Sequence, residues 1–177
     1  MRWLSLIPFA AVLLGCTPSE PPRWAEGGAR LVLPTATWQR GDDDPIEIRP
    51  NGHILEDGDL LYVVDRVGRV VDDDFEPVAL LFPDGRIAGP DDFLLGHVGV
   101  SNAAPPGRTE AWLSVLPDGN VVYFEEDGER NSGGRWTGCQ GAALRTCTLV
   151  THLIALREYL RRANTGVSVG VGIGVGF

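Results

Sequence analysis

Histidine and cysteine are the residue types in this chain best suited to metal binding or catalysis, and the sequence has three of each. His53, His97 and His152 lie far apart. None forms the His-x-x-x-His or Glu-x-x-His spacing that would place two metal ligands on one helix face. The chain has no lysine, so its glycine-rich stretches have no phosphate-loop lysine. We therefore expect no catalytic residue, no cofactor site and no metal site, and predict that the protein is not an enzyme.

Acidic residues outnumber basic ones by 24 to 15, for a formal net charge of −9, and they gather in two runs at 42–44 and 72–74. Nucleic acid is a poor partner for a chain of this charge. Carboxylates in tight turns can bind Ca²⁺, but neither run has the alternating spacing that surrounds one ion with several oxygens. Solvated turns and a calcium site both remain open for these runs.

The N-terminus reads as an export signal. One arginine is followed by about a dozen apolar residues, too few for a permanent transmembrane helix of about 20 residues, and the segment ends Leu13-Leu14-Gly15-Cys16. This ending resembles the lipobox of bacterial lipoproteins, although Leu14 stands where a small residue is more usual. The resemblance implies cleavage of residues 1–15 and acylation of Cys16, which would attach the protein to the cell envelope. Because Thr17 rather than Asp follows, it also implies the outer membrane. The alternative is an ordinary signal peptide with a chance cysteine.

The two remaining cysteines, Cys139 and Cys147, form an even pair in an exported chain, which predicts a disulfide. Two cysteines without a histidine pair do not complete a four-ligand zinc site. Their spacing rules out a bridge within one straight helix, because eight residues of helix rise about 12 Å. We therefore expect residues 138–141 to turn back onto the first turn of a helix that contains Cys147.

The chain after the signal divides by composition. Residues 16–30, rich in Pro, Gly and polar residues, are predicted to be a flexible tether. Residues 31–130 carry a repeat of about 17 residues, marked by turn glycines at 52, 68, 85 and 119, with Asn102 expected at the missing position. A β-branched residue stands two positions after each of these glycines. Each repeat therefore reads as strand, tight turn, strand, turn.

The predicted fold is mainly β: a meander of about nine short strands that forms a small barrel or flower-like sheet. An isolated hairpin is only marginally stable. About nine consecutive short strands therefore imply a shared core. Residues 68–79, 84–87 and 94–99 resemble the short hairpin repeats of "four-fold β-flower" proteins, which implies a fold type and no activity. A β-sandwich with coincidental spacing is the alternative.

Residues 131–166 are predicted to be a disulfide-stapled helical segment. Leu149, Leu153, Leu156 and Leu160 form the stripe of an amphipathic helix, and threonines make its start uncertain. Residues 167–177 alternate valine, isoleucine or phenylalanine with glycine or serine, which predicts a final strand. That strand closes or edges the protein's own sheet, or, like the last strand of an outer-membrane barrel, pairs with a partner.

These observations favour a lipid-anchored envelope protein that acts as a structural or binding module for an unknown protein partner. One alternative is a periplasm-facing, hydrolase-like enzyme whose site is dispersed over loops. A pocket lined by polar groups near Trp112, Trp136 or the acidic turns would favour it. Another is an adaptor that docks to an outer-membrane partner through residues 167–177.

Overall fold

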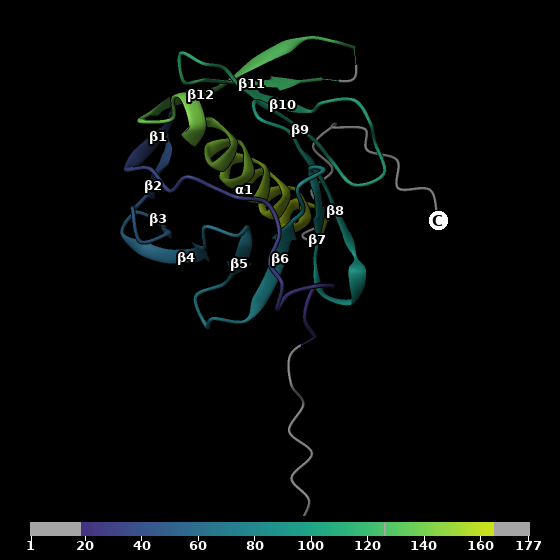
Figure 1. Cartoon of the computed structure of the whole chain (residues 1–177). Coiled ribbons are helices and arrows are strands. Elements are labelled where there is room, and N and C mark those ends of the chain that lie inside the picture. The colour runs from purple at the N-terminus through teal and green to yellow at the C-terminus, as the bar shows by residue number, and fades with distance from the viewer. Residues whose placement is uncertain (1–18, 126, 165–177) are drawn as a thin grey trace, which may run out of the picture.

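The computed structural model describes residues 19–125 and 127–164, and its architecture is a closed antiparallel barrel around one helix (Figure 1). The twelve strands are β1 (Ala36–Arg40), β2 (Asp43–Ile48), β3 (His53–Glu56), β4 (Asp59–Val64), β5 (Arg69–Val71), β6 (Pro77–Leu81), β7 (Arg86–Ala88), β8 (Leu94–Val98), β9 (Asn102–Ala104), β10 (Leu113–Val115), β11 (Asn120–Phe124) and β12 (Arg130–Thr137). The 3₁₀ turns η1 (Pro90–Asp92) and η2 (Gly141–Ala143) and the helix α1 (Leu144–Asn164) complete the described structure.

Each strand pairs with its neighbours in sequence, and β1 closes the barrel against β12, with Trp38 opposite Trp136. This confirms the prediction of a mainly β protein built from a meander of short hairpins. The barrel has twelve strands rather than about nine. The predicted boundary at residue 130 is also wrong, because β12 occupies the start of the segment expected to be helical.

One repeated backbone contact underlies the 17-residue period. Gly52, Gly68, Gly85 and Gly119 all have positive φ, between 79° and 97°, as predicted. Their carbonyls accept hydrogen bonds of 2.7–2.9 Å from the N–H groups of Val64, Leu81, Val98 and Trp136 respectively. Ser101 accepts the equivalent bond from Val115, at 2.8 Å. Ser101 therefore fills the missing position. The assignment to Asn102 was wrong by one residue, since Asn102 begins β9 and is absent from the residues with positive φ.

The residue two positions after each repeat position points into the barrel. Ile54, Val70, Ile87, Ala103 and Val121 are all at most 2% exposed. They form a ring of apolar side chains from alternate strands, and this ring faces the helix that lies in the middle of the barrel (Figure 1). The periodic β-branched residues of the sequence are thus the barrel's interior.

Helix α1 is buried on every side over most of its length, and this corrects the expectation of an amphipathic helix, which would bury only one face. From Thr146 to Leu156 every residue is buried, including three threonines and His152. Only its last turns reach the surface, where Leu160 of the predicted leucine stripe is 49% exposed. A helix enclosed by a barrel must bury its polar faces too, so each hydroxyl needs a partner inside the protein.

The described part of the predicted tether, residues 19–30, packs against the barrel, so it does not act as a free spacer. Trp24 covers Leu80, Phe82 and Ala88 on the outer face of β6 and β7. Arg69 donates to the carbonyls of Trp24 and Ala25, both at 2.7 Å. Residues 27–35 then cross the end of the barrel at which α1 begins (Figure 1). Hydrogen bonds between distant backbone groups, invisible in the composition, hold this segment in place.

Two predictions lie outside the described residues: the acylation of Cys16 after cleavage of residues 1–15, and the strand at 167–177. Among the helices that the structure describes, none has the length and apolarity required to cross a membrane.

Candidate functional site

A pocket of about 1070 Å³ opens at the end of the barrel where α1 finishes. It lies between the last turns of the helix, strands β1, β11 and β12, and the loop 105–112. Its volume is slightly above the range of about 300–1,000 Å³ that is typical of ligand sites. The wall is part aromatic and part charged, and its side chains include Trp38, Arg40, Asp43, Arg108, Glu110, Trp112, Tyr123, Phe124, Glu125, Glu158, Tyr159 and Arg162.

The two tryptophans in the pocket wall are held by hydrogen bonds from their indole nitrogens. Trp38 donates to the carbonyl of Gly133 at 2.8 Å and stacks on Trp136, with ring centroids 5.6 Å apart. Trp112 donates to Nδ1 of His152 at 3.1 Å. Trp38 is only 1% exposed, so its ring supports the wall from behind, whereas the half-buried Trp112 offers the apolar surface of its ring to whatever enters the pocket.

Arg40 joins the barrel to the helix at the base of the pocket. Its guanidinium contacts Glu56 of β3 at 2.5 Å and Glu158 of α1 at 2.6 Å, and its side chain is only 6% exposed. The same group lies 5.5 Å from the ring centroid of Trp38. Two carboxylates and a ring face therefore fix one cation, so this part of the wall is formed before any ligand arrives.

Tyr123 supplies a polar group in the aromatic part of the wall. Burial raises the pKa of its phenol well above the usual value, and the nearby Glu158 carboxylate raises it further. The phenol therefore stays protonated at any pH the folded protein meets. A protonated phenol can donate a hydrogen bond as well as accept one.

His152 lies behind Trp112, fully buried in the middle of α1. Its Nδ1 accepts from the Trp112 indole, and its Nε2 lies 2.8 Å from the Leu95 carbonyl, which fixes the neutral Nε2–H tautomer. Burial lowers the pKa of its imidazole to about 4. Both ring nitrogens are engaged, so this histidine positions Trp112 and has no nitrogen left for general-base chemistry. His53 is half-buried and His97 is exposed, each in a different strand.

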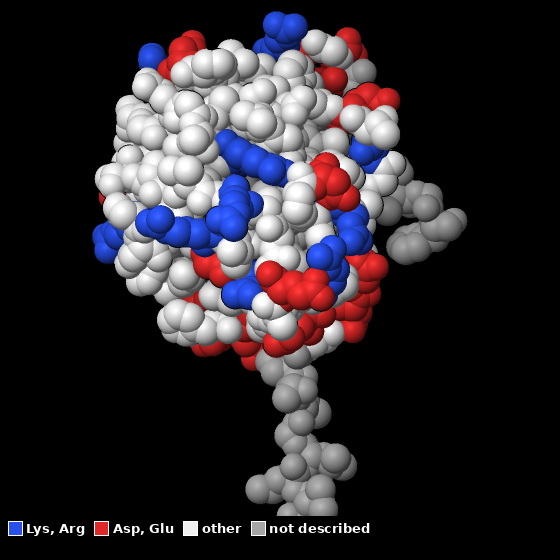
Figure 2. Space-filling view, in the orientation of Figure 1, with Lys and Arg blue, Asp and Glu red and all other residues white. Residues whose placement is uncertain are grey.

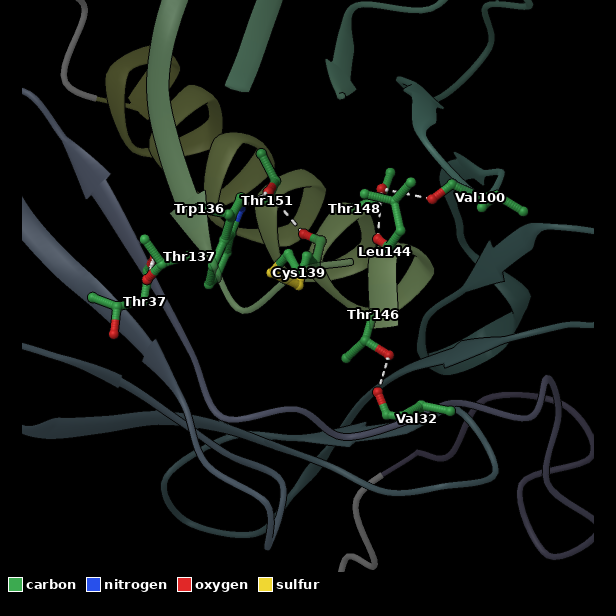
Figure 3. The surroundings of a disulfide bond; sticks show 11 residues. Val32, Thr37, Val100, Trp136, Thr137, Cys139, Leu144, Thr146, Thr148 and Thr151 are labelled. Atoms are coloured by element: carbon green, nitrogen blue, oxygen red, sulfur yellow. Dashed lines mark hydrogen bonds between the residues drawn. A yellow bond between two sulfur atoms is a disulfide. The ribbon is translucent and has the colours of Figure 1, made fainter. Parts of the chain in front are cut away.

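The buried threonines of α1 satisfy their hydroxyls within the barrel. Thr146 donates to the carbonyl of Val32 at 2.7 Å, and Thr148 lies 2.9 Å from the carbonyls of Val100 and Leu144 (Figure 3). Thr151 accepts from the indole of Trp136 at 2.9 Å. These contacts explain how weak helix formers occupy the first half of a buried helix.

The predicted disulfide between Cys139 and Cys147 is present, with a Cα–Cα distance of 6.0 Å (Figure 3). It ties the chain just after β12 to the first turns of α1, as the spacing required. Both cysteines are at most 1% exposed. The bridge lies at the start of the helix, away from the pocket at its other end.

The acidic runs behave as turn residues. The Asp72 carboxylate accepts from the N–H groups of Asp74 and Glu76, at 3.1 and 2.8 Å. Residues 42–44 lie at the turn before β2 and in its first positions. Within residues 19–125 and 127–164, no group of three or more histidine, cysteine, aspartate or glutamate side chains could hold a metal ion.

The pocket residues were missed by sequence reasoning because nothing local connects them. Arg40 is 16 residues from Glu56 and 118 from Glu158. The exceptions are Trp112 and, through Asp43, the acidic run 42–44, both named as places where a pocket would be informative. One local match was overlooked: Gly166-Val-Ser168-Val-Gly170 has the Gly-x-Ser-x-Gly spacing. It follows a helix, whereas a nucleophile elbow joins a strand to a following helix, and it lies outside the described residues.

Comparisons with known proteins return no relative. No family model, no curated protein and no solved structure matches the chain.

Proposed function

We propose that this protein is a lipid-anchored binding module of the bacterial cell envelope, held at the outer membrane by acyl chains on Cys16. The observation that carries the binding role is the pocket at the end of the barrel, whose aromatic and charged walls are fixed by contacts within the protein. Preorganised walls favour binding because little side-chain freedom is lost when a ligand enters.

The lining favours an amphipathic ligand of small to medium size. Trp112, Tyr123 and Phe124 are half-buried and offer an apolar surface. Three arginines and four carboxylates also line the pocket, so its charges nearly balance and no strongly charged ligand is selected. A molecule with an apolar body and polar ends matches this wall. A segment of a partner protein that presents an aromatic side chain beside polar groups is matched by the same chemistry.

The anchor rests on the sequence Leu13-Leu14-Gly15-Cys16 and on the disulfide, which is typical of exported proteins. Labelling cells with a palmitate analogue should tag the wild type. The Cys16→Ser variant should lose both the label and its place in the membrane fraction. Label retained by that variant would refute the anchor.

Binding is tested by titrating the protein with 1-anilinonaphthalene-8-sulfonate, an amphipathic probe, in a calorimeter. Ala163 lines the pocket from an exposed position on α1, so Ala163→Trp should fill the mouth without disturbing the core. We expect it to weaken the probe's Kd about tenfold or more, which is a loss of about 1.4 kcal/mol. Ala142→Trp, exposed at the opposite end of the helix, should bind like the wild type. Equal binding by both variants would exclude the pocket as the site.

A hydrolase-like enzyme with a dispersed site is the second candidate, because the pocket lies beside Trp112 and several carboxylates line it. Glu110, Glu125 and Glu158 are the groups that acid–base chemistry would use there. Mass spectrometry of compounds recovered after incubation with the protein separates the two functions. A binding module returns its ligand unchanged, whereas an enzyme returns a product. An adaptor role for residues 167–177 is the third candidate, and it lies outside the described residues.

A further inference from the structure

The point at which the chain reaches the barrel is fixed at one rim. The hydroxyl of Ser19, the first described residue, donates to the Asp91 carboxylate at 2.5 Å in the loop between β7 and β8. In an up-and-down meander, alternate connections lie at the same end. The loop 72–76, between β5 and β6, therefore shares this rim with the loop 89–93. In Figure 1 the described chain begins (purple) beside these loops, at the lower edge of the barrel.

This rim carries the two most exposed large apolar side chains of the described residues. Phe75 is 66% exposed and Phe93 is 64% exposed. Phe75 also has a φ of +63°, an uncommon and costly conformation for a bulky residue. The Asp72 carboxylate holds this turn through the N–H groups on either side of Phe75. The turn therefore keeps an aromatic ring in solvent at a conformational cost, which calls for a partner.

The short distance along the chain between Ser19 and Cys16 points to a lipid bilayer as that partner. Three residue steps separate Cys16 from Ser19, and a fully extended chain spans at most about 3.6 Å per residue, or about 11 Å in total. Because residues 19–30 are docked on the barrel, they add nothing to this reach. Acyl chains on Cys16 would therefore bring the rim to the surface of the bilayer that contains them.

We propose that the rim formed by the loops 72–76 and 89–93 rests on the membrane, with Phe75 and Phe93 inserted at the boundary between headgroups and acyl chains. The inference rests on the proposed acylation of Cys16. Aromatic side chains favour this boundary, where the ring is removed from water. Two such anchors beside a lipidated cysteine would hold the barrel in one orientation.

The charge of the rim selects the kind of bilayer. Six acidic residues lie in the two loops: Asp72, Asp73, Asp74, Glu76, Asp91 and Asp92. Among the described residues, an ion pair neutralises only Asp92 of these, through Arg86 at 2.8 Å. Figure 2 shows acidic side chains gathered along the lower part of the same view. Anionic lipids would repel this surface, so the rim fits a bilayer of zwitterionic lipids such as phosphatidylethanolamine.

Hydroxyl-radical footprinting of the acylated full-length protein tests the contact. The protein is placed in vesicles of phosphatidylethanolamine and phosphatidylcholine and compared with the unacylated Cys16→Ser variant in solution. We expect about fivefold less oxidation of Phe75 and Phe93 in the vesicles, because insertion removes them from water. Val100 and Leu116, 60% and 39% exposed in turns at the opposite rim, are internal controls and should be oxidised equally in both samples.

The outcomes separate the two proposals. If the mass of the protein from cells shows no acyl chain on Cys16, the anchor is refuted and the membrane contact falls with it. If Cys16 is acylated and both phenylalanines are oxidised as fast as in solution, only the membrane contact is overturned. Replacing half of the zwitterionic lipid by phosphatidylglycerol should reduce the protection at low salt, and added salt should restore it. Protection that increases with phosphatidylglycerol would also overturn the proposed orientation.

Discussion

The indole nitrogen of Trp112 lies 3.1 Å from Nδ1 of His152, so a side chain of the pocket wall is positioned by a histidine buried in the central helix. Since the opposite ring nitrogen of His152 bonds to the Leu95 carbonyl, the imidazole bridges β8 and the loop before β10. This contact links the stability of the barrel to the shape of the pocket.

The first prediction concerns pH. The pKa of His152 is about 4 in the folded protein and about 6.5 when unfolded, so only the unfolded chain takes up this proton between these values. The stability from this group is therefore present above pH 6.5 and is lost as the pH falls toward 4. Between pH 7 and pH 5 the free energy of unfolding should decrease by about 2 kcal/mol through His152 alone. Urea titrations at the two pH values measure it.

His152→Gln removes this titration while an amide can still bridge Trp112 and Leu95. The His152→Gln variant should have a lower free energy of unfolding at pH 7 than the wild type. This free energy should also change less between pH 7 and pH 5. His97→Gln, at an exposed position, is the control, and its free energy of unfolding should decrease between pH 7 and pH 5 as in the wild type. If the free energy of unfolding of His152→Gln decreased by the wild-type amount over the same pH range, His152 would not be the group responsible.

The second prediction compares two glycines of similar φ. Gly52 and Gly58 have φ of +88° and +87°, but a Cβ on Gly52 would lie 2.0 Å from the Val64 carbonyl oxygen, whereas one on Gly58 meets nothing within 4 Å. Gly58→Ala should cost about 1 kcal/mol from backbone strain alone. Gly52→Ala should cost about 3 kcal/mol, because the contact between repeats must also open. Thermal or urea unfolding measures both losses of stability. Equal losses for the two variants would mean that the close contact between Gly52 and Val64 does not contribute to stability.

The third prediction concerns the disulfide. Reducing the Cys139–Cys147 bridge should lower the free energy of unfolding by about 2.5 kcal/mol, since the closed loop restrains the unfolded chain. The double variant Cys139→Ala/Cys147→Ala should show a similar loss and no further response to reductant. Non-reducing mass spectrometry of the exported protein should find neither thiol free. Detecting both as free thiols would refute the bridge.

The fourth prediction tests the docking of residues 19–30. Trp24→Ala removes the ring that covers Leu80 and Phe82, and should release this segment while the barrel stays folded. Trypsin cleavage after Arg30, an exposed site, should then become about tenfold faster, as expected for a local loss of about 1.4 kcal/mol. Val32→Ala, which alters an exposed side chain of the same segment, should be cleaved like the wild type. Equal rates for all three proteins would mean that Trp24 does not hold the segment.

The sequence alone determined the features that depend on local chemistry. The turn glycines were predictable because positive φ excludes most side chains, and the β-branched residues two positions later because inward positions of a hairpin repeat at a fixed offset. The Cys139–Cys147 bridge followed from the cysteine count and from the axial rise of a helix. These features together predicted a mainly β protein of short hairpins with one helix.

Only the tertiary structure decided where that helix lies. Its threonines are compatible with water or with buried carbonyls, so the sequence could not distinguish a helix on the surface from one inside the barrel. The choice depends on acceptors such as Val32 and Val100, which come from distant segments. The pocket depends equally on closure of the barrel, since Arg40, Glu56 and Glu158 meet only when β1, β3 and the end of α1 are brought together. Contacts between residues so far apart in the sequence depend on how the whole chain packs, so no local sequence pattern predicts them.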